Sequence, residues 1–348
     1  MTNDLLIGSF RILDASVNRA SEGLRTLEEF ARFVLEDRNL SGLVKSLRHD
    51  LRLAIESLPL SDRLAARAVA SDCGTTIELD SERERSDALS VASAAAARAQ
   101  EAVRCIEEYG KTVAHFDSRA IESIRYRLYT VSAAICLTPS RKQRFEDARL
   151  YLLLPCDESV DRFAGTVETL FTSGVDIIQL RDKQADDRQL YRCAKVASDL
   201  ARRLGKCFIV NDRADIAAAT HASGVHVGQE ELPVEAVRRV IGTSAIIGVS
   251  THSLDQAKAA VLDGADYIGC GPTFPSQTKS FAEFPGLAFL REVASQITLP
   301  AFAIGGIDES NVDSVMNTGI HGVAVSSAIM AKPDPLAAAT ALKKAVSR

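Results

Sequence analysis

Two hydroxyl side chains and one ammonium group lie within four residues of a glycine- and proline-containing loop. The loop follows the short apolar run Tyr267–Gly271 and carries Ser276, Thr278 and Lys279. Glycine and proline residues at this density indicate a turn with a defined backbone conformation. Hydroxyls, backbone amides and a cation are donors that bind phosphate. We therefore expect this loop to contact a phosphorylated ligand.

Two further groups of charged residues predict a polyanion site with a metal ion. Gln179, Arg181 and Lys183 alternate along an extended segment, so their side chains share a face and can converge on one anion. Asp212 and Glu231 are acidic residues of the kind that holds Mg²⁺ against substrate phosphates. A diphosphate with Mg²⁺ would satisfy all of these groups. Without a ligand, the same charges could merely neutralise one another.

Small residues follow two later apolar segments and predict a second phosphate contact. Gly306 comes after one segment, and Ser326 and Ser327 come after the next. Backbone amides and a helix N-terminus at such positions form the common phosphate site of barrel enzymes. His226 and Cys270 lie within or beside apolar strands, where we expect packed structural residues. The pattern requires no nucleophile.

The elements that must position these residues alternate between short apolar strands and helical stretches. This alternation over residues 149–348 is typical of a parallel α/β arrangement. The predicted strands are Leu150–Leu154, Ile177–Leu180, Phe208–Asn211, Gly224–Val227, Ala245–Val249, Tyr267–Gly269, Ala301–Ile304 and Gly322–Val325. Eight strands predict a (β/α)8 barrel, in which polar residues at the carboxyl ends of the strands build the active site.

Residues 1–137 predict an all-α domain with an internal duplication. Apolar residues recur at three- and four-residue spacing, and Leu24, Leu27, Phe30, Ala31 and Val34 fall on one stripe of the first helix. Asn18, Glu22, Arg25 and Glu29 fall on another stripe. We take the polar segment 138–148, which contains Pro139, as the linker to the barrel.

The duplication is visible as an aligned pair of segments. Arg19–Arg32 matches Arg98–Lys111 at charged and apolar positions, and residues 43–53 match residues 120–130 more weakly. The match predicts two related helical hairpins packed as a four-helix bundle. The repeated Arg and Glu rows fit either solvated ion-pair ladders or a buried or interfacial polar site.

A long loop near residues 59–86 is expected to join the two hairpins. Its cluster Ser71–Thr76 offers hydroxyl and backbone donors. The cluster could bind phosphate, or it could simply cross from one hairpin to the other.

The composition of the 348-residue chain is that of an ordinary globular protein, with 46% hydrophobic residues and a net charge of −5. This charge argues against a nucleic-acid or anionic-membrane surface. The seven cysteines form no CxxC pair, which predicts neither a disulfide framework nor a zinc site and fits the reducing cytoplasm. We expect no signal peptide and no membrane span.

Seven motifs from about residue 150 onward occur in the order and spacing of one enzyme family. They are QLRDK, NDR, GVHVGQEE, GVSTHS, GPTFPSQTK, AIGGI and VSSAI. This part of the chain resembles the thiamine-phosphate synthases. The resemblance implies that a pyrimidine-methyl diphosphate loses pyrophosphate and that the nitrogen of a thiazole phosphate captures the carbocation. The exocyclic amine of the pyrimidine stabilises that cation, so the protein positions the substrates and stabilises the departing diphosphate.

The resemblance also implies residue roles. The pyrimidine diphosphate would contact Gln179, Arg181, Lys183 and Asn211. Mg²⁺ would be bound by Asp212 and Glu231, and the catalytic residues would be Lys183, Ser250 and Lys279, the last two holding the leaving pyrophosphate. The thiazole phosphate would contact Ser276, Thr278, Gly306, Ser326 and Ser327.

Two positions depart from the family pattern. Glu231 stands where the second Mg²⁺ position is usually aspartate. Glutamate keeps the charge and is one methylene longer, so we expect an adjusted loop or a water-mediated contact rather than loss of the metal. Ser276 in place of the usual threonine is a milder change.

The segment RILDASVNRASEGLRTLEEFARF resembles a helical domain fused before this synthase in some bacteria. That domain family is associated with phosphorylating hydroxymethylpyrimidine phosphate to the diphosphate, the substrate of the barrel. The matching residues are Asp14, Asn18, Arg19, Glu22, Arg25, Asp72, Gly74 and Thr75. The sequence has no P-loop, so the kinase assignment depends on the resemblance.

Two alternatives stay open at this point. The barrel could be a thiazole tautomerase-like relative without synthase activity, although Lys183, Asp212 and Lys279 favour the synthase. The helical domain could be a non-catalytic dimerisation or regulatory module. A homo-oligomer is compatible with the sequence, and the expected ligands are small phosphorylated pyrimidines and thiazoles.

Overall fold

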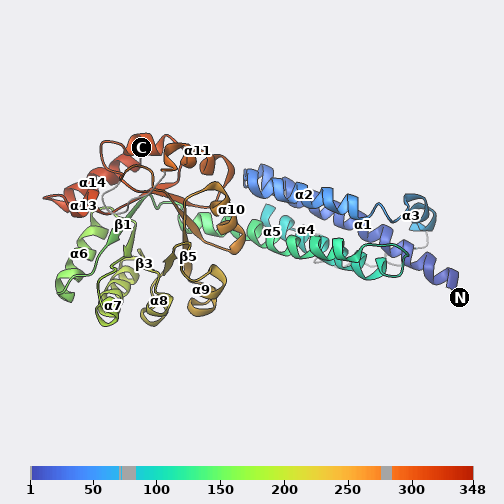
Figure 1. Ribbon diagram of the computed structural model, residues 1–348, viewed down its shortest axis with the longest axis horizontal. Helices are drawn as coiled ribbons and strands as arrows, with labels where there is room; N and C mark the ends of the chain where they lie inside the picture. The colour runs from blue at the N-terminus through green and yellow to red at the C-terminus, as the bar shows by residue number, and fades with distance from the viewer. Residues whose placement is uncertain (1, 70–71, 73–83, 276–283, 348) are drawn as a thin grey trace. The chain divides into compact units, whose positions relative to one another are not determined.

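The computed structural model describes residues 2–69, 72, 84–275 and 284–347. The chain divides into two compact units, Met1–Pro139 and Ser140–Arg348 (Figure 1). Among the described residues, no helix is both long enough and apolar enough to cross a membrane.

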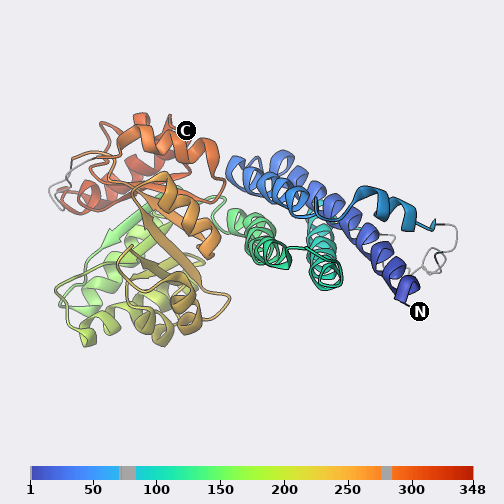
Figure 2. The same ribbon diagram turned by 45° about the vertical axis from the view of Figure 1, so that its right-hand side comes forward.

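The first unit consists of two helical hairpins and a short helix between them, within the part of the chain that is described. Its helices are α1 (Thr2–Phe33), α2 (Arg38–Ala54), α3 (Leu60–Ala66), α4 (Ala88–Gly110) and α5 (Ser118–Arg144). The predicted duplication is therefore present as two hairpins, α1–α2 and α4–α5 (Figure 2). The connection near 59–86 is not entirely a loop, because Leu60–Ala66 forms α3 directly after Pro59, whose fixed φ suits a helix start.

Small residues let α1 and α4 pack closely. A Cβ atom at Gly23 would lie 2.7 Å from the carbonyl oxygen of Ala95 and 3.0 Å from the Cβ of Ala99. The predicted apolar stripe of α1 is buried from Leu24 to Ala31. Val34, which was placed on the same stripe, is exposed because α1 ends at Phe33.

Each hairpin has an ion pair between equivalent positions of its two helices. Glu28 of α1 pairs with Arg48 of α2, and Glu107 of α4 accepts a 2.6 Å hydrogen bond from Arg125 of α5. Both glutamates are buried. The exposed pair Arg25–Glu29 is instead an ordinary i,i+4 contact of 2.8 Å. The repeated charges thus include both an exposed i,i+4 pair and buried pairs between helices.

The segment 138–148 differs from the linker that its polarity suggested. Helix α5 continues to Arg144 with Pro139 inside it, and the boundary between the units falls within this helix. Residues after the boundary belong to the second unit: Arg141 pairs with Asp266 at 3.3 Å, and Phe145 is buried against the ring of Tyr267. These contacts explain why the segment is ordered despite its polar composition.

The second unit is a closed barrel of parallel strands, in which each strand pairs with the next and β8 pairs with β1. The described strands are β1 (Leu150–Leu154), β2 (Ile177–Leu180), β3 (Cys207–Asn211), β4 (Gly224–Val227), β5 (Ile246–Thr251), β6 (Tyr267–Cys270), β7 (Ala301–Ile304) and β8 (Gly322–Val325). The predicted (β/α)8 barrel is confirmed. Strand β5 runs two residues further than expected, so Ser250 lies within it.

Helices surround the strands (Figure 1). They are α6 (Val160–Thr172), α7 (Asp187–Leu204), α8 (Ala214–Thr220), α9 (Val234–Ile241), α10 (Leu254–Asp263), α11 (Gly286–Gln296), α12 (Val312–Met316), α13 (Ser327–Met330) and α14 (Pro335–Val346). Side-chain caps begin several of them: Ser159, Asp186 and Ser253 each accept a hydrogen bond from the backbone N–H three residues later. The caps direct each chain segment back along the outside of the barrel.

Candidate active site at the carboxyl end of the barrel

The predicted pyrimidine and diphosphate ligands lie at the inner carboxyl ends of neighbouring strands. Gln179 of β2, Asn211 of β3 and Ser250 of β5 occupy inward positions, and Asn211 is in register with His226 of β4. Side chains alternate between the two faces of a strand, and these four residues share the inner face. The barrel thus brings together residues that are far apart in the sequence.

A continuous chain of hydrogen bonds joins two of these residues through the barrel interior. The amide nitrogen of Gln179 donates to the Tyr151 hydroxyl at 2.9 Å, and the Tyr151 and Tyr267 hydroxyls are 2.7 Å apart. The Tyr267 hydroxyl is 3.0 Å from Nδ1 of His226, and Nε2 of His226 is 2.9 Å from Oγ of Ser250. We call these five residues the interior chain.

The interior chain was not predicted from the sequence. His226 was expected to be a packed structural residue, and its imidazole also contacts the predicted site residue Ser250. A usable signal was present: Gly224, His226 and Gly228 alternate with apolar residues, which places His226 on the inner face of β4. Burial, followed by the charge of Arg181, lowers the pKa of His226 to about 4. The ring is therefore neutral near pH 7.

Cys270 behaves as expected. It is buried, its thiol lies near the Thr251 hydroxyl, and burial raises its pKa to about 12. A thiol in this state is a packing residue rather than a nucleophile.

The predicted metal ligands are electrostatically coupled. Burial, followed by the nearby charge of Glu231, raises the pKa of Asp212, while Lys183 and Arg181 act in the opposite direction. The amide nitrogen of Asn211 donates to Oδ2 of Asp212 at 2.6 Å. An aspartate whose charge is disfavoured by a neighbouring carboxylate, with cationic side chains nearby, suits a divalent cation and a phosphate ligand.

Glu231 folds back over a glycine. A Cβ atom at Gly228 would lie 2.3 Å from Oε2 of Glu231, so the absence of a side chain there leaves room for the carboxylate. The expected adjusted loop or water-mediated contact at Glu231 stays a prediction. Among the described residues, no group of three or more His, Cys, Asp and Glu side chains is arranged to bind a metal. A cation here would take its remaining ligands from substrate oxygens and water.

The small-residue phosphate positions lie at the same end of the barrel. Gly305 and Gly306 have φ angles of 102° and 65°, and a Cβ at Gly306 would lie 2.7 Å from the carbonyl oxygen of Pro275. Ser326 and Ser327 are exposed after β8. Ser276, Thr278 and Lys279 lie outside the described residues.

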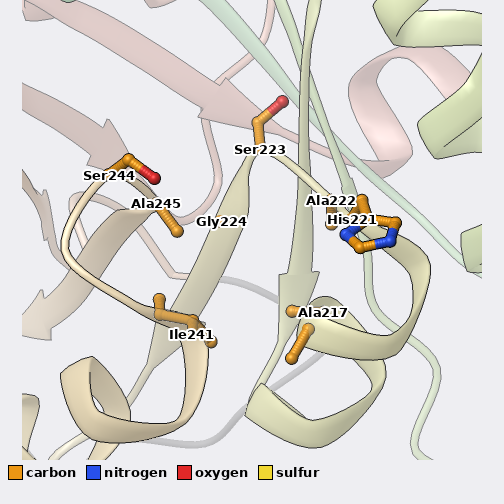
Figure 3. A pocket seen from close by; sticks show the side chains of 9 residues that line it. Ala217, His221, Ala222, Ser223, Gly224, Ile241, Ser244 and Ala245 are labelled. Carbon is orange, nitrogen blue, oxygen red and sulfur yellow. The ribbon is translucent and has the colours of Figure 1, made fainter.

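The cleft shown in Figure 3 is elsewhere in the barrel. It lies between α8 and α9 and is lined by His221, Ser223 and Ser244 together with alanine and isoleucine side chains. Ser223 precedes β4, so the cleft is at the amino end of the strand. It contains none of the predicted site residues and no charged side chain that would bind a diphosphate.

In the first unit, one of the predicted site residues is buried and the other described ones are exposed. Asp14 is buried and accepts hydrogen bonds of 2.7 and 3.0 Å from Arg67, with Arg63 at 3.9 Å. Neither arginine was predicted as a site residue, because both lie in the connection between the hairpins. The remaining predicted residues of this site that are described are exposed, and they are Asn18, Arg19, Glu22, Arg25 and Asp72. Gly74 and Thr75 lie outside the described residues.

The fold is a TIM barrel whose predicted site residues gather at the carboxyl ends of the strands. The family model described as thiamine monophosphate synthase matches residues 150–329, and the model described as the ThiD2 family matches residues 11–134. The chain belongs to the thiamine-phosphate synthase family, carries a ThiD2 domain before the barrel, and is a transferase.

Curated relatives match over nearly the whole chain. A thiamine-phosphate synthase of Rhodopirellula baltica is 47% identical, over 94% of this chain and 90% of the relative. A thiamine-phosphate synthase of Thermosynechococcus vestitus is 40% identical, over 97% of this chain and 95% of the relative. Among solved structures, a thiamine phosphate pyrophosphorylase from Pyrococcus furiosus is 36% identical with a TM-score of 0.52. The match covers 58% of this chain and 96% of the Pyrococcus chain. The matches to the curated relatives therefore span the sequence of both units.

Proposed function

We propose that the barrel condenses hydroxymethylpyrimidine diphosphate with hydroxyethylthiazole phosphate and releases pyrophosphate. The observation that carries this proposal is the convergence of Gln179, Asn211 and Ser250 on the inner carboxyl end of the barrel, beside the coupled carboxylates of Asp212 and Glu231. An amide that faces a pyrimidine and a hydroxyl that faces a diphosphate are what this reaction requires.

In this proposal, the site residues promote the reaction by positioning the substrates and by stabilising the charge of the diphosphate. Arg181 and Lys183 compensate the diphosphate, and Ser250 donates to the leaving group as its charge develops. Because charge moves onto pyrophosphate during departure, donors held in advance stabilise the transition state more than the bound substrate. The carbocation is stabilised by the pyrimidine's own amine, so no protein nucleophile is needed.

The carboxylates of Asp212 and Glu231 fit Mg²⁺. Bound Mg²⁺ would neutralise diphosphate charge. Asn211 holds Asp212 through the 2.6 Å hydrogen bond, and Gly228 leaves space for Glu231. The carboxylates thereby remain near the cationic side chains that would contact the same diphosphate.

The test is a synthase assay on the purified full chain with both substrates and MgCl2, with product detected by chromatography. We expect thiamine phosphate and one equivalent of pyrophosphate, and no turnover in excess EDTA. Absence of product with a folded protein would instead favour the tautomerase-like alternative. Conversion of a thiazole tautomer by the same protein would then support that alternative directly.

Lys279 is assigned to the departing pyrophosphate. Lys279→Ala should lower kcat by about a hundredfold or more while changing the KM for thiazole phosphate little, because the lost charge acts in the transition state. Initial rates at varied thiazole phosphate measure both constants. An equal loss in both would show that Lys279 contacts the other phosphate.

We further propose that the ThiD2 domain phosphorylates hydroxymethylpyrimidine phosphate. The family match and the buried Asp14 with its two arginines support this. The full chain is incubated with ATP, Mg²⁺ and the monophosphate, with thiazole phosphate omitted so that the barrel cannot consume the diphosphate. We expect the diphosphate to accumulate, and Asp14→Asn to reduce its formation at least about tenfold because the arginines lose their counter-charge.

Asp50→Asn is the matched control for the kinase test, because Asp50 pairs with Arg127 at the surface of the same unit. It should leave the rate unchanged. No diphosphate from a folded wild-type chain would favour the dimerisation or regulatory alternative, which light scattering of the full chain would then test.

A further inference from the structure

The interior chain runs between two residues assigned to different parts of the pyrimidine substrate. It begins at Gln179, which the proposed function places against the pyrimidine ring, and ends at Ser250, which the proposed function places against the diphosphate. Its middle residues, Tyr151, Tyr267 and His226, have no role in the proposed function. Tyr151 and Tyr267 are almost completely buried.

The barrel makes room for this chain at two glycines. A Cβ at Gly248 would lie 2.4 Å from the Tyr267 hydroxyl and 2.5 Å from Nδ1 of His226. A Cβ at Gly269 would lie 3.3 Å from Cε1 of His226. A larger residue at position 248 would occupy the place of the hydrogen bond between Tyr267 and His226, so the contact depends on the local sequence.

The hydrogen bonds of the interior chain can run consistently in only two directions. Each tyrosine hydroxyl and the neutral imidazole carries one polar hydrogen, so each can donate to one neighbour and accept from the other. If Gln179 donates to Tyr151, then Tyr151 donates to Tyr267, and Tyr267 donates to Nδ1 of His226. The imidazole hydrogen is then on Nε2 and is donated to Ser250. Reversing the Gln179 amide reverses every bond.

Both ends of the pyrimidine substrate require the same direction of hydrogen-bond donation along the interior chain. Diphosphate oxygens only accept hydrogen bonds, so the Ser250 hydroxyl must be free to donate to them. The exocyclic amine of the pyrimidine donates, so Gln179 must present its carbonyl oxygen and direct its amide nitrogen to Tyr151. Both conditions hold only when the chain runs from Gln179 to Ser250.

We propose that Tyr151, Tyr267 and His226 are positioning residues that fix the hydrogen-bond direction of Gln179 and Ser250 before substrate binds. This inference rests on the proposed synthase function. It predicts that His226 is the Nε2–H tautomer in the free enzyme. It also predicts that breaking the chain impairs departure of pyrophosphate without affecting the thiazole phosphate site.

The tautomer is measured by long-range ¹H–¹⁵N NMR of the full chain with ¹⁵N-labelled histidine near pH 7, and the His226 signals are assigned by their loss in His226→Gln. We expect the Nε2–H pattern in the wild type. In Tyr267→Phe, Nδ1 loses its hydrogen-bond partner, and we expect a shift toward a tautomer mixture. The kcat should fall roughly tenfold or more, since Ser250 no longer donates reliably. The KM for thiazole phosphate should stay within about twofold.

Tyr191→Phe on the exposed surface of α7 is the matched control and should change neither quantity. An Nδ1–H tautomer or an imidazolium in the wild type would overturn the proposal, as would a Tyr267→Phe variant with unchanged tautomer and kcat. If Tyr267→Phe fails to fold, Tyr151→Phe breaks the chain one bond earlier and should give the same two changes. A wild type that makes no thiamine phosphate contradicts the synthase proposal alone, because the tautomer is measured without turnover.

Discussion

At the scale of single residues, two histidines of the barrel make it sensitive to acid. Burial lowers the pKa of both His226 and His321 to about 4, with Arg181 and Arg149 as the second causes. In the unfolded chain a histidine titrates near pH 6.5. As the pH falls from about 6.5 to 4, the unfolded state binds protons that the folded state does not, so stability is lost across this window.

His321→Asn should reduce this acid destabilisation. Each histidine contributes at most about 3 kcal/mol between the two pKa values, so the variant should lose about half of the pH-dependent difference. Urea unfolding of the barrel at pH 7 and pH 5 measures it. A variant whose stability falls with acid as steeply as that of the wild type would show that other groups dominate.

Substitutions at Glu231 test whether a glutamate can replace the aspartate that is usual at this position in the family. Glu231→Asp should retain Mg²⁺-dependent activity, whereas Glu231→Gln should raise the Mg²⁺ concentration for half-maximal activity at least about tenfold because one charge is lost. Titration of synthase activity with MgCl2 measures both. Equal Mg²⁺ dependence in Glu231→Gln and the wild type would remove Glu231 from the metal site.

At the scale of elements, the duplicated ion pairs of the helical unit should differ in strength. The Arg125 side chain is 9% exposed and that of Arg48 is 34% exposed, although their glutamate partners are similarly buried. Glu107→Gln should therefore destabilise the unit by about 3 kcal/mol, because the buried Arg125 loses its partner at 2.6 Å and keeps only Glu122 at 4.0 Å. Glu28→Gln should cost less, since water reaches Arg48.

Urea unfolding followed by far-UV circular dichroism, with a separate transition fitted to each unit, measures these changes. Glu29→Gln removes an exposed pair and is the control, with an expected effect below about 0.5 kcal/mol. A larger loss from Glu28→Gln than from Glu107→Gln would contradict the argument from burial.

At the scale of the whole molecule, the end of α5 belongs to the barrel. A fragment of residues 140–348 keeps Arg141 and Phe145, whereas one of residues 149–348 loses both. Phe145 packs against Tyr267 and Phe302 at ring distances of 5.2 and 6.1 Å. Loss of a buried phenylalanine costs about 3–5 kcal/mol. We expect the longer fragment to be stable and the shorter one to be destabilised by at least that amount.

Thermal unfolding of the two fragments, with Phe145→Ala in the longer one, tests this. The substitution should account for most of the difference between them. Two fragments of equal stability would place residues 140–148 outside the barrel's core.

Local sequence patterns predict the eight strands and the two helical hairpins, both of which the structure contains, whereas the roles of the rim residues stay predictions. These features depend on signals within a few residues: a period of two in strands, a period near 3.6 in helices, and motifs such as QLRDK and NDR. The buried stripe of α1 was predicted for the same reason. Val34 was wrongly included in this stripe, because periodicity does not show where a helix ends.

Three other features emerge only in three dimensions: the interior chain, the pairing of Asp14 with Arg67, and the extension of α5 into the barrel unit. Tyr151 and Tyr267 are 116 residues apart in the sequence, and Asp14 and Arg67 are 53 apart. No local pattern encodes such contacts, because they arise from strand register and from glycines that leave space in a closed barrel. The inner face of β4 was visible in the sequence, but what His226 contacts there was not.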